Sequence, residues 1–92
     1  MKQIVTLQSI LDVQSGENER GTWYRGGMVC ESLDGHQRQM AFKVQGKQNL
    51  DDLQQIPVGS TIEVTFQAFS RKFNDKWYTD LVVSHIDTLK AN

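Results

Sequence analysis

Apolar and polar side chains alternate along residues 39–46 and again along residues 61–70. The apolar positions are Met40, Phe42 and Val44 in the first run and Ile62, Val64, Phe66 and Ala68 in the second. Because successive side chains of a strand point to opposite sides of a sheet, this period of two predicts half-buried β-strands with those residues facing inward. The chain is therefore expected to be built around paired strands.

The other strands are predicted at residues 4–13, 22–33 and 76–87. A polar loop over residues 15–21 separates the first two of them, and Asp34-Gly35 is a strong hairpin signal at the end of the second. Asn74-Asp75 is another, since both side chains tolerate the left-handed backbone of a tight turn. Residues 89–92 are expected to fray.

A short helix is predicted between the third and fourth strands. Its apolar residues recur at every third position, at Leu50, Leu53 and Ile56. Asn49 is the predicted N-cap, and the acidic pair Asp51-Asp52 would complement the positive end of the helix dipole. Pro57 and Gly59 end the helix before the next strand begins.

Five strands with one helix between the third and the fourth match the element order of the OB-fold, a small Greek-key barrel. The predicted fold class is therefore all-β, a five-stranded barrel formed by one domain over residues 1–92. Gly26-Gly27 in the second strand would let that strand bend enough to close the barrel, or would mark a bulge. A four-stranded α+β sheet is the competing topology.

Composition and charge restrict the possible partners and compartment. Ten basic and eleven acidic side chains give a net charge of −1, so only a local basic patch would attract a polyanion. The single cysteine, Cys30, excludes an intramolecular disulfide, is expected to be buried, and fits a cytoplasmic location. No apolar run approaches the ~20 residues of a membrane helix. The amino end also lacks the apolar segment of a signal peptide, so no membrane association is expected.

Catalysis is not predicted. The two histidines, His36 and His85, show no metal-ligand spacing, and neither has a nucleophile or acid nearby in the sequence that completes a catalytic set. No phosphate-binding glycine loop or dinucleotide fingerprint occurs. The chain is thus expected to act without catalytic residues, metal or cofactor.

Residues 69–80, FSRKFNDKWYTD, combine four aromatic rings with three cations. Aromatic platforms beside positive charge are typical of proteins that bind single-stranded nucleic acid. OB-folds bind oligonucleotides across their second and third strands, between the loop after strand one and the loop that joins strands four and five. The predicted nucleic-acid contacts in these elements are Trp23, Arg25, Lys43, Phe69, Arg71, Lys72, Phe73, Lys76 and Tyr78.

The same residues have other interpretations. Trp23 and Trp77 are also candidates for structural caps on the barrel ends, because tryptophan is usually largely buried. Exposed rings such as Phe69 and Phe73 also mark protein interfaces. Two hypotheses therefore remain: a sequence-tolerant binder of single-stranded DNA or RNA, and a module that recognises protein, including a second copy of itself.

Three segments resemble a small bacterial family catalogued as domain of unknown function 3127. They are GTWYRGGMVCES at 21–32, PVGSTIEVTF at 57–66 and FNDKWYTD at 73–80, and the resemblance extends over nearly the entire chain. It implies an OB-fold related in shape to bacterial single-stranded DNA-binding proteins. Typical proteins of that kind recruit partners through a long acidic tail, and the sequence ends without one, so recruitment by that route is not expected.

Overall fold

The computed structural model describes residues 1–36 and 38–92. In these residues it contains six strands and one helix. The elements are β1 (Lys2–Ile10), β2 (Gln14–Asn18), β3 (Gly21–Ser32), β4 (Gln39–Gln45), α1 (Lys47–Gln54), β5 (Thr61–Phe73) and β6 (Lys76–Lys90). No helix in this part of the chain is long and apolar enough to cross a membrane.

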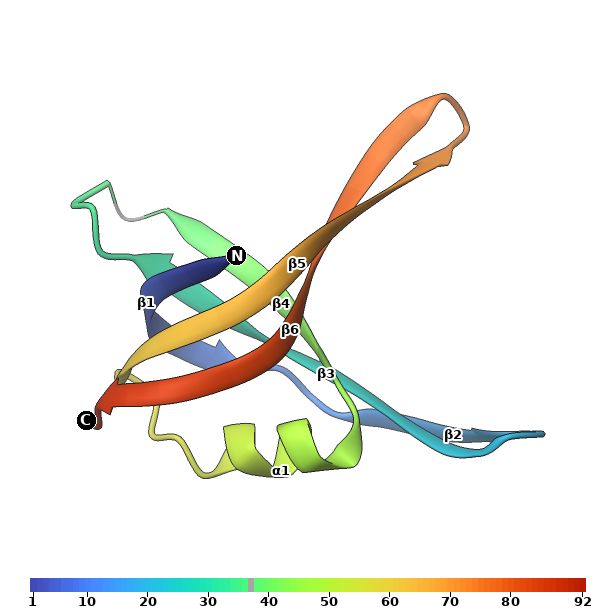
Figure 1. The fold of residues 1–92 in the computed structure, drawn as a ribbon, viewed down its shortest axis with the longest axis horizontal. Helices are drawn as coiled ribbons and strands as arrows, with labels where there is room; N and C mark the ends of the chain where they lie inside the picture. The colour runs from blue at the N-terminus through green and yellow to red at the C-terminus, as the bar shows by residue number, and fades with distance from the viewer. Residues whose placement is uncertain (37) are drawn as a thin grey trace.

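Strand pairing closes the sheet into a barrel. β1 pairs antiparallel with both β3 and β5, and the ring continues through the β5–β6 and β3–β4 pairs. A parallel contact between β4 and β6, with Lys43 opposite Val82, completes it. Figure 1 shows α1 lying across one end of this ring. The predicted OB-fold is confirmed, with β2 as an additional strand attached to the edge of β3.

The core fills the inside of the barrel with apolar side chains from β1, β3, β4, α1, β5 and β6. The rings of Phe42 and Phe66 meet edge to face, with centroids 5.1 Å apart. The buried residues are Val5, Leu7, Met28, Cys30, Phe42, Val44, Leu50, Leu53, Ile62, Val64, Phe66 and Val83. The predicted inward faces are therefore largely confirmed. Ala68 is the exception, because it is exposed where β5 leaves the barrel.

Gly26-Gly27 does not form a bulge in the β3–β4 pair. The β3–β4 register runs without a shift. The two glycines instead mark the point where β3 changes partner, since Arg25 pairs with β2 and Met28 pairs with β1. A Cβ atom on Gly27 would lie 2.7 Å from the carbonyl oxygen of Phe42. A side chain at this position would therefore push apart two strands of the barrel wall.

Residues 15–21 form a hairpin and not the predicted polar loop. β2 pairs with the start of β3, and Gly16 lies directly opposite Trp23. The Trp23 indole lies so close to Gly16 that a Cβ there would be 2.5 Å from it. This contact between a ring and bare backbone supports a strand pair with almost no apolar residues of its own.

The start of α1 also differs from the prediction. Gly46 is the N-cap, with φ at 89°, a left-handed conformation that glycine adopts without strain. Asn49 lies inside the first turn, where its side-chain amide donates to the carbonyl of Gln45 at 3.1 Å. No acidic residue lies in the first turn, so Asp51-Asp52 does not complement the dipole as expected.

The C-terminal residues are ordered against the barrel and do not fray. β6 continues to Lys90, which pairs with Thr61. The backbone nitrogen of Asn92 donates to the hydroxyl of buried Ser60 at 3.0 Å, and its side chain donates to the Val58 carbonyl at 2.9 Å. These long-range contacts explain why local composition predicted fraying wrongly.

Candidate nucleic-acid interface

Two hairpins in the described part of the chain extend beyond the barrel (Figure 1). The β2–β3 arm comprises residues 14–25, and the β5–β6 arm comprises residues 67–82. In Figure 1 the arms diverge from the same side of the barrel, so that their bases flank the surface of β3 and β4. An OB-fold binds oligonucleotides on this surface.

A groove of about 680 Å³ lies between the bases of the two arms. Its walls come from the segment after β1, from β3 and β4, and from the base of the β5–β6 arm. The four charged residues in its lining are Asp12, Arg25, Lys43 and Asp80. Their formal charges cancel, and Lys43 Nζ lies 3.1 Å from Asp80 Oδ2. The groove is therefore electrically balanced, and net attraction for phosphate has to come from the arms.

The turn of the β5–β6 arm is the tight hairpin that the sequence predicts. Asn74 and Asp75 have φ values of 50° and 64°, which is the left-handed pair of a type I′ turn. From Phe66–Val83 to Phe73–Lys76 the strand register is uninterrupted. Side chains on this arm therefore alternate strictly between its two faces.

One face of the β5–β6 arm collects most of the predicted contacts. Cross-strand pairing places Arg71 opposite Tyr78, Phe73 opposite Lys76, and Phe69 opposite Asp80, and opposed residues share a face. We call Phe69, Arg71, Phe73, Lys76 and Tyr78 the ring-and-cation face. Its rings are open to solvent, with exposed fractions of 54% for Phe69, 64% for Phe73 and 45% for Tyr78. A shallow hollow of about 330 Å³ lies beside Arg71, Lys72, Phe73 and Tyr78.

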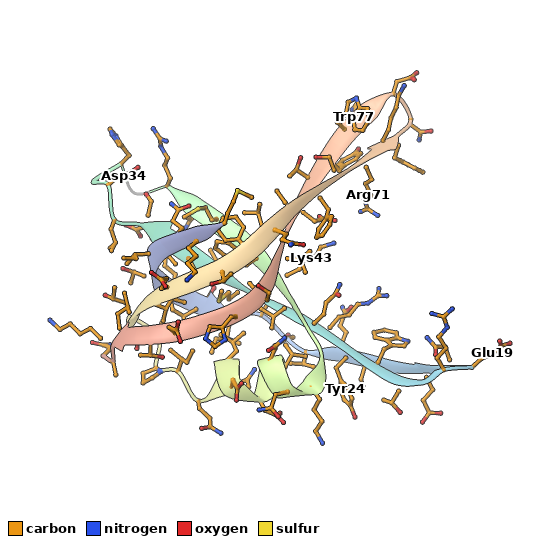
Figure 2. All side chains as sticks on the ribbon, in the orientation of Figure 1. Glu19, Tyr24, Asp34, Lys43, Arg71 and Trp77 are labelled. Atoms are coloured by element: carbon orange, nitrogen blue, oxygen red, sulfur yellow. The ribbon has the colours of Figure 1, made fainter. Side chains whose placement is uncertain are left out.

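Lys72 and Trp77 lie opposite one another on the other face of the arm. Lys72 Nζ is 3.9 Å from Asp75 Oδ1, a weak pair, and the Lys72 side chain also borders the hollow beside Arg71, Phe73 and Tyr78. The Trp77 side chain is 69% exposed, so the prediction of a barrel cap is wrong. Figure 2 shows Trp77 and Arg71 on opposite sides of the arm. Trp77 has the parity of the core residue Val83, so strand parity predicts an inward ring, and Trp77 is exposed because its pair with Lys72 lies beyond the end of the barrel wall.

Trp23 and Arg25 occupy the β2–β3 arm, across the groove from the other predicted contacts. Trp23 is half-buried against Gly16, within its own arm and not at a barrel end. The Arg25 guanidinium carbon lies 4.8 Å from the Trp23 ring centroid, a cation–π contact. Much of this ring is therefore already covered, whereas Arg25 also lines the groove.

The titratable groups away from the groove show no catalytic arrangement in the described residues. His85 Nε2 lies 2.8 Å from Asp87 Oδ1 in an exposed pair on β6. Burial raises the pKa of the Cys30 thiol to about 12, which suppresses its thiolate form. No group of three His, Cys, Asp or Glu side chains among residues 1–36 and 38–92 could hold a metal ion.

The barrel, its two arms and the groove between them define an OB-fold of the type found in single-stranded DNA-binding proteins. The mitochondrial single-stranded DNA-binding protein Rim1 from S. cerevisiae superposes with a TM-score of 0.80 at 15% identity, over 100% of this chain and 96% of Rim1. A second crystal form of Rim1 gives a TM-score of 0.68, over 100% of this chain and 94% of the other. The small single-stranded DNA-binding protein from Streptomyces coelicolor gives 0.56 at 11% identity, over 96% and 89% of the two chains.

The chain belongs to the family described as Domain of unknown function (DUF3127), whose sequence pattern matches residues 4–87. The resemblance identified from the sequence is thereby confirmed. A comparison with curated proteins gave no match. At identities of 11–15% the structural similarity demonstrates a common fold.

Proposed function

We propose that this protein binds single-stranded nucleic acid, DNA or RNA, with little sequence preference and without catalysis. The observation that carries the proposal is the ring-and-cation face, where three exposed rings and two cations occupy one side of the β5–β6 arm beside the groove. The fold shared with Rim1 supports it, because OB-folds use this surface for oligonucleotides.

The rings provide the affinity and explain the tolerance to sequence. Each stacked base contributes about 1–3 kcal/mol, and every base has a π-face that a phenyl ring can cover. Phe69 and Phe73 carry no hydrogen-bonding group in their side chains, so neither distinguishes one base edge from another. A duplex keeps its bases stacked on each other, so this surface favours single strands.

The cations provide local attraction for phosphate. The net charge of the whole chain is −1, so only the local distribution of charge can favour a polyanion. Arg71 and Lys76 on the ring-and-cation face and Arg25 at the groove make no ion pair with a described residue. These three are the proposed phosphate contacts. Lys43 is not counted among them because its charge is neutralised by Asp80.

The β5–β6 arm also supports a second candidate function, protein recognition. Beyond the Gln67–Val82 pair the outer edges of β5 and β6 have no strand partner among the described residues, and unpaired edges can add a strand from another chain. Under either proposed function, the single buried thiol, Cys30, is compatible with a cytoplasmic location. If the partner is a second copy of the chain, pairing through these edges would produce a homo-oligomer.

A fluorescence titration of the tryptophans with oligo-dT, at low and at moderate salt, tests the proposal. Nucleic-acid binding should quench the emission, and the affinity should fall as salt rises. The solution mass of the free protein is measured in parallel. An unresponsive protein that forms a stable oligomer would contradict nucleic-acid binding and support protein recognition.

A further inference from the structure

The face of the β5–β6 arm opposite the ring-and-cation face has its own exposed ring and cation. Trp77 is 69% exposed and lies directly across the strand pair from Lys72. The next pair on this face, Ser70 and Thr79, joins its hydroxyl groups by a hydrogen bond of 2.9 Å. These short side chains leave the indole uncovered. No described residue packs on this face to explain so large an exposed ring.

Charge favours a polyanion over a second copy of the chain as the occupant of this face. Residues 67–82 of the arm carry three cations and two carboxylates, and one of these carboxylates, Asp80, is paired with Lys43 on β4. Pairing two copies through their arms would bring both sets of cations together, which is unfavourable. A phosphate backbone has the opposite sign and gains from the same charges.

We infer that Trp77 and Lys72 form a second stacking site, so that one continuous strand of nucleic acid contacts both faces of the arm. This inference rests on the proposed function. Adjacent strands of a sheet lie about 4.8 Å apart, so a two-stranded ribbon is narrow enough for a flexible chain to pass over its edge. The strand stacks on Phe69, Phe73 and Tyr78 on one side and on Trp77 on the other.

The second site makes binding depend on the length of the strand. A short oligonucleotide fills the ring-and-cation face and does not reach Trp77. A long one reaches both faces and occludes more nucleotides per protein. Loss of the Trp77 ring should therefore lower the affinity for long strands and leave the affinity for short strands nearly unchanged.

The test compares oligo-dT of about 5 nucleotides, near the lower end of the usual site sizes of an OB-fold, with oligo-dT of about 20 nucleotides, beyond their upper end. Affinity is read from the anisotropy of end-labelled oligonucleotide, for the wild type, Trp77→Ala and Trp77→Phe. Trp77→Ala should lose at least about fivefold in affinity for the long strand, the equivalent of one weakly stacked base, and less than about twofold for the short one. Trp77→Phe keeps a ring and should retain most of the affinity for the long strand.

A Trp23→Phe background leaves Trp77 as the sole tryptophan, so its emission reports this face alone. The long strand should quench Trp77 and the short one should not. Circular dichroism establishes that each variant is folded. Unchanged Trp77 emission, with long-strand affinity equal in Trp77→Ala and wild type, would overturn the second site while leaving the proposed function intact.

Two further outcomes would also overturn the inference. A wild type that binds neither length would remove the proposed function and the second site together. A Trp77→Ala protein whose solution mass drops below that of the wild type would assign this face to contact between copies of the chain.

Discussion

Lys43 and Asp80 form an ion pair, 3.1 Å between Nζ and Oδ2, that joins β4 on the groove floor to the base of the β5–β6 arm. Both side chains keep contact with solvent, so the pair adds little to stability, about 0–1 kcal/mol. Its main consequence is electrostatic. The carboxylate neutralises the lysine that lines the groove on β4.

Replacing Asp80 by Asn should strengthen binding of short oligo-dT, because Lys43 becomes free for phosphate. Three phosphate contacts, Arg25, Arg71 and Lys76, give an expected salt slope of about −2 for the wild type, at roughly −0.7 per contact. The Asp80→Asn variant should give about −3. Affinity measured over a range of salt concentrations checks both values. Asp51→Asn removes the same charge from an exposed position of α1 and should leave the slope unchanged.

Phe73→Ala should weaken binding of short oligo-dT more than Lys72→Ala does. Removing a stacking ring costs about 1–3 kcal/mol, whereas Lys72 lies on the other face with its ammonium near Asp75. The two residues are neighbours on β5, so each variant controls for the other. The anisotropy of end-labelled oligonucleotide, titrated with each protein, gives the comparison. A much larger loss for the lysine variant would show that charge, and not stacking, dominates.

Gly27→Ala should lower the free energy of unfolding by roughly 1–3 kcal/mol, as expected for overpacking. Its Cβ would lie 2.7 Å from the backbone oxygen of Phe42, which can move only if the strands separate. Gly26→Ala should cost less, since its Cβ would meet the flexible end of Leu50 at 2.6 Å. Urea denaturation of both variants measures the difference. Equal losses would indicate that the β3–β4 contact at Gly27 is not tight.

Burial of Cys30 should make stability fall at alkaline pH. The pKa of this thiol rises from 9.0 to about 12 in the folded protein. Above pH 9 the unfolded chain loses the proton and the folded chain keeps it, so unfolding becomes easier, by up to about 1.4 kcal/mol per pH unit. Below pH 9 both states are protonated and the effect vanishes.

Urea denaturation between pH 8 and about pH 10 measures this slope, and Cys30→Ala is the control without a titrating thiol. The variant should start less stable because of its cavity, yet lose less stability as the pH rises. Equal slopes for the two proteins would contradict a protected thiol. Rapid alkylation of the folded wild type would contradict it as well.

The barrel could be predicted from the sequence because alternation and turn signals are local. Phe42, Val44, Ile62 and Val64 all face inward as their parity predicts. Parity gives the face of a strand but not the length over which that face is covered. Ala68 has the parity of a core residue and is nevertheless exposed, because the barrel wall ends near Phe66.

The β2–β3 arm and the C-terminal contacts could not be predicted because they depend on long-range pairing. β2 reads as a loop since both of its faces are polar, and the ring of Trp23 over Gly16 supplies the missing packing. Asn92 is held by Ser60, far away in the sequence. The sequence predicted which strands carry the candidate site. It did not predict that the site is divided between two faces of one arm, because that division depends on the uninterrupted register of β5 and β6 from Phe66 onward.

The central claim is that a single strand stacks on the ring-and-cation face beside the groove. An NMR titration of isotope-labelled protein with short oligo-dT tests it most directly, because each backbone amide reports its own surroundings. The largest shifts should map to Phe69, Arg71, Phe73 and Tyr78, with smaller ones along the groove on β3 and β4. A spectrum unchanged in excess oligonucleotide, or shifts confined to α1 and the β1 wall of the barrel, would contradict the proposed interface.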